Sequence, residues 1–237
     1  MSEWLTTPMT NQSKHKIVLI EILKDIYSDP HLRTALGFKG GTAAFLFYDL
    51  PRLSVDLDFD LLQVEKKEVV FKIVKDILNK HGTIYDAVEK RFTLFFLVSY
   101  EKGERAVKVE ISKRSVSSRY ELKSYLGISM LVMEQGDMVA SKLSALLTRK
   151  KFAMRDVFDI WFFLKNKWVI NEALLLEKTG LALNEALEQA VKKISELSKN
   201  QLLQGLGDLL DLRQKDWVRE KLKEETLFYL RLYRKEN

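Results

Sequence analysis

The clearest pattern of hydrophobic and polar positions in the chain is a strict alternation from Ser54 to Leu61. Such alternation predicts a β-strand with one apolar face and one polar face. The polar face carries Ser54, Asp56, Asp58 and Asp60. Aspartate is depleted in strands, and like charges on one strand face repel each other unless a cation lies between them. This segment is therefore the first candidate for a functional site.

Periodic spacing of apolar residues predicts helices along most of the chain. The expected helices span 11–27, 42–48, 66–80, 136–148, 155–165, 184–197, 201–212 and 217–233. β-Branched and aromatic residues predict further strands over 83–88, 92–100 and 106–112. Together these elements predict an α+β fold. A small mixed sheet with helices packed on it is expected in a first domain, 1–125, and a helical domain is expected at 126–237.

The amino-acid composition excludes some kinds of functional site and permits some kinds of binding partner. The chain has 237 residues and no cysteine, so disulfides, thiolate zinc sites and cysteine nucleophiles are excluded. Its net charge of +6 permits an anionic partner such as nucleic acid. The first residues, Met1 to Thr7, show no basic region followed by an apolar core, and no apolar run is long enough to cross a bilayer. We therefore expect a cytoplasmic protein without a membrane partner.

The aspartates of the alternating strand are candidate metal ligands. Carboxylate oxygens are hard ligands of the kind that Mg²⁺ or Mn²⁺ prefers. We expect Asp56 and Asp58 to bind the metal, and Asp60 to lie at the end of the strand or behind the ligands. The alternative is a solvated polar face on an edge strand, with no ligand at all.

A glycine-rich turn precedes this strand. Gly40 and Gly41 let backbone N–H groups approach a phosphate closely, and Thr42 opens a predicted helix whose N-terminus favours an anion. Lys39 would add positive charge there. Metal-binding carboxylates beside a phosphate-binding turn indicate nucleotide chemistry, although two glycines by themselves also fit an ordinary turn.

Glu110 is a candidate for a third carboxylate. Lys108, Glu110 and Ser112 share one face of the strand predicted over 106–112. If this strand pairs with the aspartate strand, Glu110 joins the two aspartates in a cluster suited to phosphoryl transfer with two metal ions. In the alternative, Glu110 is exposed and pairs with Lys108 or Lys113.

The densest basic stretch has no acidic residue between Lys142 and Arg155, and it includes Arg149, Lys150 and Lys151. It reads either as a solvated helix face and loop or as a cationic wall for the phosphates of a nucleotide or an RNA. Asp156 and Asp159 follow on the next predicted helix, where Asp156 also suits the helix N-terminus.

These segments occur in the same order in a known family. The chain has Lys-Gly-Gly-Thr, then Leu-Pro-Arg-Leu-Ser-x-Asp-Leu-Asp-Phe-Asp, then Val-Glu-Ile, then Ala-Ser-Lys-Leu-Ser-Ala-Leu-Leu-x-Arg with Arg-Asp-x-x-Asp. From about Lys39 to Leu164 it resembles the AbiEii/AbiGii toxin family, nucleotidyltransferase-like proteins of toxin–antitoxin and phage-defence systems. The region past about Asn166 matches no motif.

The resemblance implies a polymerase-β-like nucleotidyltransferase fold joined to a helical domain. By position, Gly41 and Thr42 match the phosphate-binding turn, and the metal motif falls on Ser54, Asp56 and Asp58. Lys142 matches the catalytic lysine of the family, and either Asp159 or Asp156 matches its late aspartate. Members of the family transfer nucleotides to the acceptor end of tRNA or bind one nucleotide preferentially.

We therefore expect a metal-dependent nucleotidyltransferase that uses a nucleoside triphosphate to modify an RNA, with tRNA as the expected acceptor. We expect it to be the toxin of a toxin–antitoxin pair, with a cognate antitoxin as a partner. The predicted catalytic residues are Asp56, Asp58, Glu110, Lys142 and Asp159. The predicted nucleotide-binding residues are Lys39, Gly40, Gly41, Thr42, Ser54, Lys142, Arg149, Arg155 and Asp156. The alternatives are a transferase for small molecules such as aminoglycosides, and a catalytically inactive member that binds RNA or protein.

Overall fold

The computed structural model describes residues 11–114 and 117–236, so the N-terminal segment Met1 to Thr7 lies outside the described residues. Contacts divide the chain into two compact units. Unit 1 comprises the described residues of Met1–Thr42, Val55–Ser115 and Leu122–Val132, and unit 2 comprises those of Ala43–Ser54, Val116–Glu121 and Met133–Asn237. The two units interleave along the chain, and the division into domains 1–125 and 126–237 stays a prediction.

A mixed sheet of seven strands is built around the alternating segment. Its order is β3-β4-β5-β2-β1-β7-β6. The strands are β1 (Leu36–Lys39), β2 (Asp56–Leu61), β3 (Thr83–Glu89), β4 (Thr93–Ser99), β5 (Val107–Ser112), β6 (Tyr120–Tyr125) and β7 (Ile128–Met133). β2 pairs antiparallel with β1 and parallel with β5, so it lies in the interior of the sheet. The alternative of an edge strand for the aspartate segment is therefore wrong.

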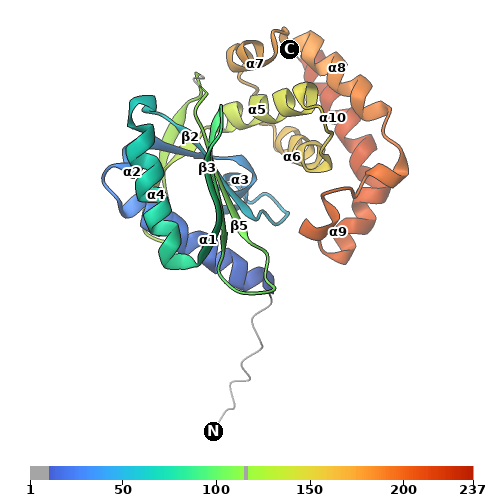
Figure 1. The fold of residues 1–237 in the computed structure, drawn as a ribbon. Helices are drawn as coiled ribbons and strands as arrows, with labels where there is room; N and C mark the ends of the chain where they lie inside the picture. The colour runs from blue at the N-terminus through green and yellow to red at the C-terminus, as the bar shows by residue number, and fades with distance from the viewer. Residues whose placement is uncertain (1–10, 115–116, 237) are drawn as a thin grey trace. The chain divides into compact units, whose positions relative to one another are not determined.

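The apolar face of the sheet is buried under helices of unit 1. Figure 1 shows α1 (Asn11–Ser28) and α4 (Lys67–His81) beside the sheet, with the short α2 (Leu32–Ala35) close to them. Phe71 of α4 packs on Phe96 of β4, with ring centres 4.9 Å apart, and Tyr27 of α1 packs on Phe59 of β2 at 6.3 Å. Because side chains alternate along a strand, burial of this face leaves the aspartates on the opposite face.

Unit 2 is mostly helical. Its helices are α5 (Gln135–Thr148), α6 (Met154–Lys165), α7 (Glu172–Thr179), α8 (Leu183–Ser195), α9 (Leu212–Trp217) and α10 (Lys223–Glu236), and α3 (Gly40–Phe47) runs from unit 1 into unit 2. Its core includes Phe158 and Trp161, whose rings contact each other and the partly buried Trp217. The predicted α+β fold, with a mixed sheet and a C-terminal helical part, is confirmed.

Several predicted elements need correction. The helix predicted over 201–212 is absent; that stretch holds the 3₁₀ turns Lys199–Gln201 and Gly207–Leu209 instead. The helix predicted over 217–233 begins as a π-helical turn, Val218–Leu222, before α10. β1, β6, β7 and α7 were not predicted from the sequence pattern. No helix among the described residues is long and apolar enough to cross a membrane.

Candidate functional site

Three carboxylates form a row on the polar face of the sheet in unit 1. β2 and β5 pair in parallel, with Asp58 opposite Glu110 and Asp56 opposite Lys108. Directly paired residues on neighbouring strands point to the same face of a sheet. The structure therefore brings Asp56, Asp58 and Glu110, here called the carboxylate row, onto one face. The pairing on which the sequence argument for Glu110 depended is present.

The glycine turn packs directly against this row. Gly40 has a left-handed backbone with φ of +81°, and a Cβ atom placed on it would lie 2.7 Å from Oδ2 of Asp58. Any larger residue would therefore clash with the carboxylate as well as strain the backbone. The hydroxyl of Thr42, two residues into α3, donates a hydrogen bond to the backbone oxygen of Asp56. These contacts hold the start of α3 beside the row.

Lys39 and Asp60 form an ion pair at the end of β1. Nζ of Lys39 lies 2.5 Å from Oδ1 of Asp60, which is buried. Lys39 is also the strand partner of Asp58. The charge of Asp60 is therefore balanced by Lys39, and its predicted place behind the metal ligands stays a prediction.

Lys108 lies among the carboxylates. Its Nζ is 3.2 Å from Oδ2 of Asp56 and 3.6 Å from Oε2 of Glu110. Burial opposes its charge, but the carboxylates, Asp56 first, outweigh burial and raise its pKa. From the sequence, Lys108 was expected only as an alternative partner for Glu110, and its contact with Asp56 was not predicted.

Asp58 is the carboxylate of the row whose charged form is disfavoured, because its pKa is raised. Burial raises its pKa most, and the nearby Asp56 and Glu110 carboxylates raise it further, whereas Lys108 and Lys39 lower it. A carboxylate with a raised pKa is one whose charged form lacks compensation. The row thus has a deficit of positive charge that Lys108 relieves only in part.

The donor set of the row suits a divalent metal. Its oxygens are hard ligands on adjacent strands, and additional positive charge there would stabilise Asp58. Among the residues that the structure describes, no three metal-binding side chains converge closely enough to hold an ion, and Lys108 contacts two of the three carboxylates instead. A bound metal would take over the role of the Lys108 ammonium. The donor chemistry of Asp56, Asp58 and Glu110 therefore fits a divalent metal, and their side chains would have to draw together to hold one.

A second group of predicted site residues lies within unit 2. Nζ of Lys142 on α5 lies 3.0 Å from Oδ1 of Asp156 and 2.7 Å from Oδ2 of Asp159 on α6. Nη1 of Arg149 lies 2.6 Å from Oδ2 of Asp156. Both aspartates are buried, so their charges depend on these partners. The two helices are thereby tied together by ion pairs.

Arg52 completes this group. Its Nε lies 2.6 Å from Oδ1 of Asp159 and its Nη2 lies 2.7 Å from Oδ2, a bidentate arrangement. Burial opposes ionisation of Asp159, but Arg52 and then Lys142 outweigh it and lower the pKa of the carboxyl. We call Arg52, Lys142, Arg149, Asp156 and Asp159 the charge network. Arg52 was not among the predicted site residues, although its position between Pro51 and the aspartate strand is a signal in the sequence.

The remaining predicted residues are close to these groups in sequence. Ser54 is partly buried and precedes β2 by two positions, and Arg155 stands in the first turn of α6. Lys150 and Lys151 are exposed between α5 and α6, so this part of the basic run is solvated. Asp156 does lie in the first turn of α6, as its helix-terminal position predicted.

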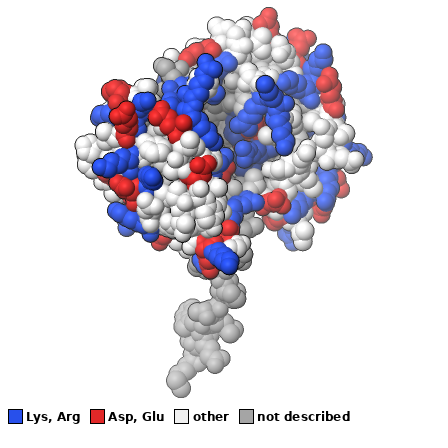
Figure 2. All heavy atoms as spheres, viewed as in Figure 1, with Lys and Arg blue, Asp and Glu red and all other residues white. Residues whose placement is uncertain are grey.

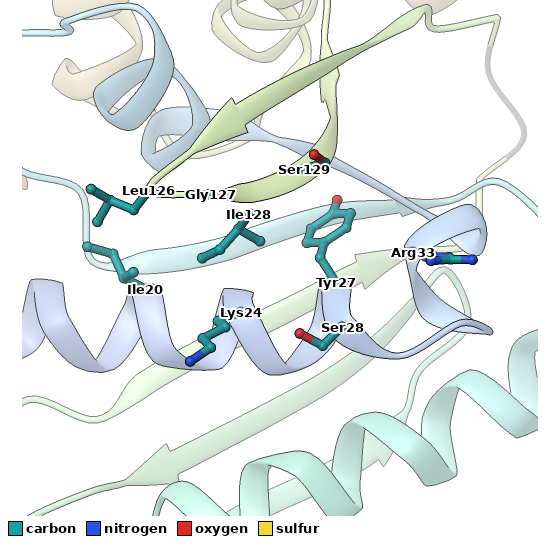
Figure 3. A pocket seen from close by; sticks show the side chains of 9 residues that line it. All are labelled: Ile20, Lys24, Tyr27, Ser28, Arg33, Leu126, Gly127, Ile128 and Ser129. Carbon is teal, nitrogen blue, oxygen red and sulfur yellow. The ribbon is translucent and has the colours of Figure 1, made fainter.

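A pocket elsewhere in unit 1 contains none of the predicted residues. Its cavity has a volume of about 430 Å³. Figure 3 shows the side chains that line it, from α1 and from the turn at Leu126 and Gly127. Tyr27 points into this space, but its hydroxyl lies 3.1 Å from the backbone oxygen of Leu36, to which it donates a hydrogen bond. Burial raises the pKa of Tyr27, so the hydroxyl stays protonated. The ring is therefore structural, and the carboxylate row remains the candidate site.

Solved structures share this fold. A candidate nucleotidyltransferase from H. pylori is 23% identical, covering 96% of each chain with a TM-score of 0.65. JHP933 from Helicobacter pylori is 22% identical, with 97% of this chain and 94% of that chain covered and a TM-score of 0.64. No protein with a curated description matches the chain.

A family model extends the similarity over most of the sequence. The model described as "Nucleotidyl transferase AbiEii toxin, Type IV TA system" matches residues 21–227. This range includes the glycine turn, the carboxylate row and the charge network. It also reaches well past residue 166, where the sequence analysis found no motif. The chain therefore belongs to the AbiEii nucleotidyl transferase toxin family.

Proposed function

We propose that the protein is a metal-dependent nucleotidyltransferase that moves a nucleotide from a nucleoside triphosphate to an RNA, with tRNA as the acceptor. Membership of the AbiEii family supports the reaction class and a role as a toxin. The observation that carries the proposal is the register of Asp58 opposite Glu110, next to a turn at Gly40 that only glycine fits. Carboxylates and a helix N-terminus side by side suit a metal-bound triphosphate.

The proposed reaction is a substitution at the α-phosphorus. An acceptor hydroxyl oxygen forms a bond to that phosphorus, the bond to the oxygen leading to the β-phosphate breaks, and pyrophosphate leaves. Asp56 and Asp58 would hold the metal, and Glu110, the third carboxylate, would take the proton of the hydroxyl. A bound Mg²⁺ or Mn²⁺ lowers the pKa of an attacking hydroxyl and offsets charge on the leaving group.

The nucleotide-binding roles follow from local chemistry. Backbone N–H groups at Gly41 and Thr42 belong to the first turn of α3, where phosphate is favoured. Lys142 and Arg149 would supply cations for the triphosphate, and Asp156 and Asp159 would hold those cations in place. Lys39, Ser54 and Arg155 complete the proposed set as polar or charged neighbours.

RNA is the proposed acceptor because of charge. The net charge is +6, and Figure 2 shows Lys and Arg side chains in groups on the visible face, with Asp and Glu between them. An antitoxin partner and action in the cytoplasm follow from the proposed role as a toxin. The competing acceptor is a small molecule such as an aminoglycoside, and the inactive alternative is a module that binds without catalysis.

The test is a transfer assay with purified protein. Each α-labelled nucleoside triphosphate is incubated with Mg²⁺ or Mn²⁺ and with either total RNA or aminoglycosides, and released pyrophosphate is measured in parallel. Label in the tRNA fraction, lost in the Asp56→Asn and Asp58→Asn variants, is expected. Label found only in small molecules would show that the acceptor is a small molecule and not RNA. Nucleotide binding without release of pyrophosphate would show that the protein is the inactive alternative, a module that binds without catalysis.

A further inference from the structure

A group of cations and aromatic rings lies at the turn between β3 and β4 in unit 1. Nζ of Lys90 is 3.6 Å from the ring centre of Phe95. The guanidinium carbons of Arg91 and Arg114 each lie 4.8 Å from the ring centre of Phe92. We call these five residues the cation–aromatic surface. Phe92 is 43% exposed, so its ring is accessible to a ligand.

The backbone around this surface is well ordered by hydrogen bonds. The N–H of Lys90 donates to the oxygen of Thr93 at 2.8 Å, and the N–H of Lys113 donates to the oxygen of Phe92 at 2.8 Å. The turn and the end of β5 are thereby joined. Phe92 and its two guanidinium groups are therefore presented by sheet-anchored backbone, which lowers the entropic cost of binding a ligand.

The positive charge of the surface is largely uncompensated. Glu89 is the nearest acidic neighbour in sequence, and its carboxylate already binds Lys67 at 3.1 Å and Lys113 at 2.5 Å. Among the described residues, no ion pair involves Arg91 or Arg114. Their charges remain available to an anion that approaches the Phe92 ring.

One part of the surface, Phe95 with Lys90 over its ring, lies in register with the carboxylate row. Phe95 is the strand partner of Glu110, and Glu110 is the strand partner of Asp58. Phe95, Glu110 and Asp58 therefore point to the same face of the sheet, on strands about 4.8 Å apart. Lys90, above the Phe95 ring, thus stands on the face that carries the candidate chemistry.

We propose that the cation–aromatic surface binds the single-stranded segment of the RNA acceptor next to its reactive end. A base would stack on Phe92, and phosphates would contact Arg91, Arg114 and Lys90. A ring flanked by guanidinium groups suits unstacked bases and backbone phosphates together, which a duplex does not offer. This inference rests on the proposed function for the identity of the ligand as an acceptor, but binding itself can be measured without catalysis.

The test measures binding of a fluorescently labelled single-stranded oligoribonucleotide by anisotropy. Phe92→Ala should lower affinity about fivefold or more, as loss of a base–aromatic stack does. Arg91→Gln/Arg114→Gln should flatten the dependence of affinity on salt, with a log–log slope smaller by about 1.4. The matched controls on unit 2 are Phe228→Ala, at a ring 58% exposed, and Arg219→Gln/Arg234→Gln. The controls should leave both quantities close to wild type.

The outcomes separate this inference from the proposed function. Equal losses in the surface variants and the controls, or unchanged affinity in Phe92→Ala, would overturn the inference while leaving transfer to RNA intact. Equal losses for single-stranded and duplex RNA would exclude stacking. If the surface variants instead keep RNA affinity and lose binding of a co-expressed antitoxin, the surface recognises protein, and the inference is wrong. Absence of any transfer to RNA, together with RNA affinity lost only in the surface variants, would refute the proposed function and support single-stranded RNA binding at this surface.

Discussion

Arg52 and Asp159 form a bidentate ion pair that is closed off from solvent. The side chains are 2% and 0% exposed, and their two contacts are 2.6 and 2.7 Å long. Arg52 stands just before the aspartate strand, and Asp159 lies 107 positions later, on α6. Lys142 shares the carboxylate at 2.7 Å. Asp159, a candidate catalytic residue, is thus bound by two cations, Arg52 and Lys142. The first role of Asp159 is therefore to position Lys142.

Loss of Arg52 should destabilise the protein strongly. Arg52→Met leaves the buried Asp159 charge with one partner fewer, and breaking such a pair costs about 3–5 kcal/mol. Urea unfolding measures the difference. The control is Arg219→Met, which removes an exposed pair with Asp216 and should cost less than about 1 kcal/mol. If Arg52→Met and Arg219→Met lower the free energy of unfolding equally, the buried ion pair contributes no more to stability than the exposed one.

Acid should weaken the fold through Asp159. Its folded pKa lies below the ordinary value of about 3.9, so the unfolded chain binds more protons at this group as the pH falls. The contribution of Asp159 is therefore fully present above about pH 4 and is lost as the pH falls through the lowered pKa. Unfolding free energies measured across this range should fall less steeply in Arg52→Met/Asp159→Asn than in the wild type. If the unfolding free energy falls equally steeply with pH in the variant and the wild type, Asp159 is not the source of the acid sensitivity.

Asp58→Asn should separate stability from activity. The raised pKa of Asp58 means that its charged form is disfavoured in the fold, so at neutral pH the folded state carries a cost that the neutral amide removes. We expect a small gain in the stability of the metal-free protein, below about 2 kcal/mol, together with a loss of nucleotide transfer of about 100-fold or more.

Thermal unfolding without metal, together with the transfer assay, checks this prediction. Asp86→Asn, at an exposed aspartate on β3, is the matched control and should change neither quantity. A destabilised Asp58→Asn would show that the carboxylate is a structural hydrogen-bond acceptor rather than a strained ligand.

Replacement of Lys108 should expose the competition between its ammonium and a metal. Lys108→Met removes the cation that lies 3.2 Å from Asp56, so the repulsion in the carboxylate row increases. We expect a less stable metal-free protein whose melting temperature rises more steeply with Mn²⁺ or Mg²⁺ concentration. An apparent metal affinity about tenfold tighter would correspond to about 1.4 kcal/mol.

The readout for Lys108 is a metal-dependent thermal shift, which requires no substrate. Lys102→Met, at an exposed position between β4 and β5, provides the control. A thermal shift that is the same for Lys108→Met and the wild type would mean that the ammonium and the metal do not share a place.

Local pattern alone was enough for much of unit 1. The alternation from Ser54 to Leu61 predicted β2 and its polar face, and helical spacing predicted α1 and α4 within a residue or two. These predictions succeed because the two-residue period of a strand and the 3.6-residue period of a helix can both be read from residues that are close in sequence. The glycine turn was also visible, and Gly40 does take the left-handed conformation that such a turn uses.

Long-range pairing was decided by the tertiary structure. β1 was missed because a strand of four residues is stabilised by partners far away in the sequence, as in the pairing of Phe38 with Val132. The same holds for charge. Whether an arginine is solvated or buried against a carboxylate depends on contacts that no spacing records, so Arg52 and Lys108 acquired their roles only in the fold. The sequence determined which side chains face away from the apolar core; the fold determined which charges they meet there.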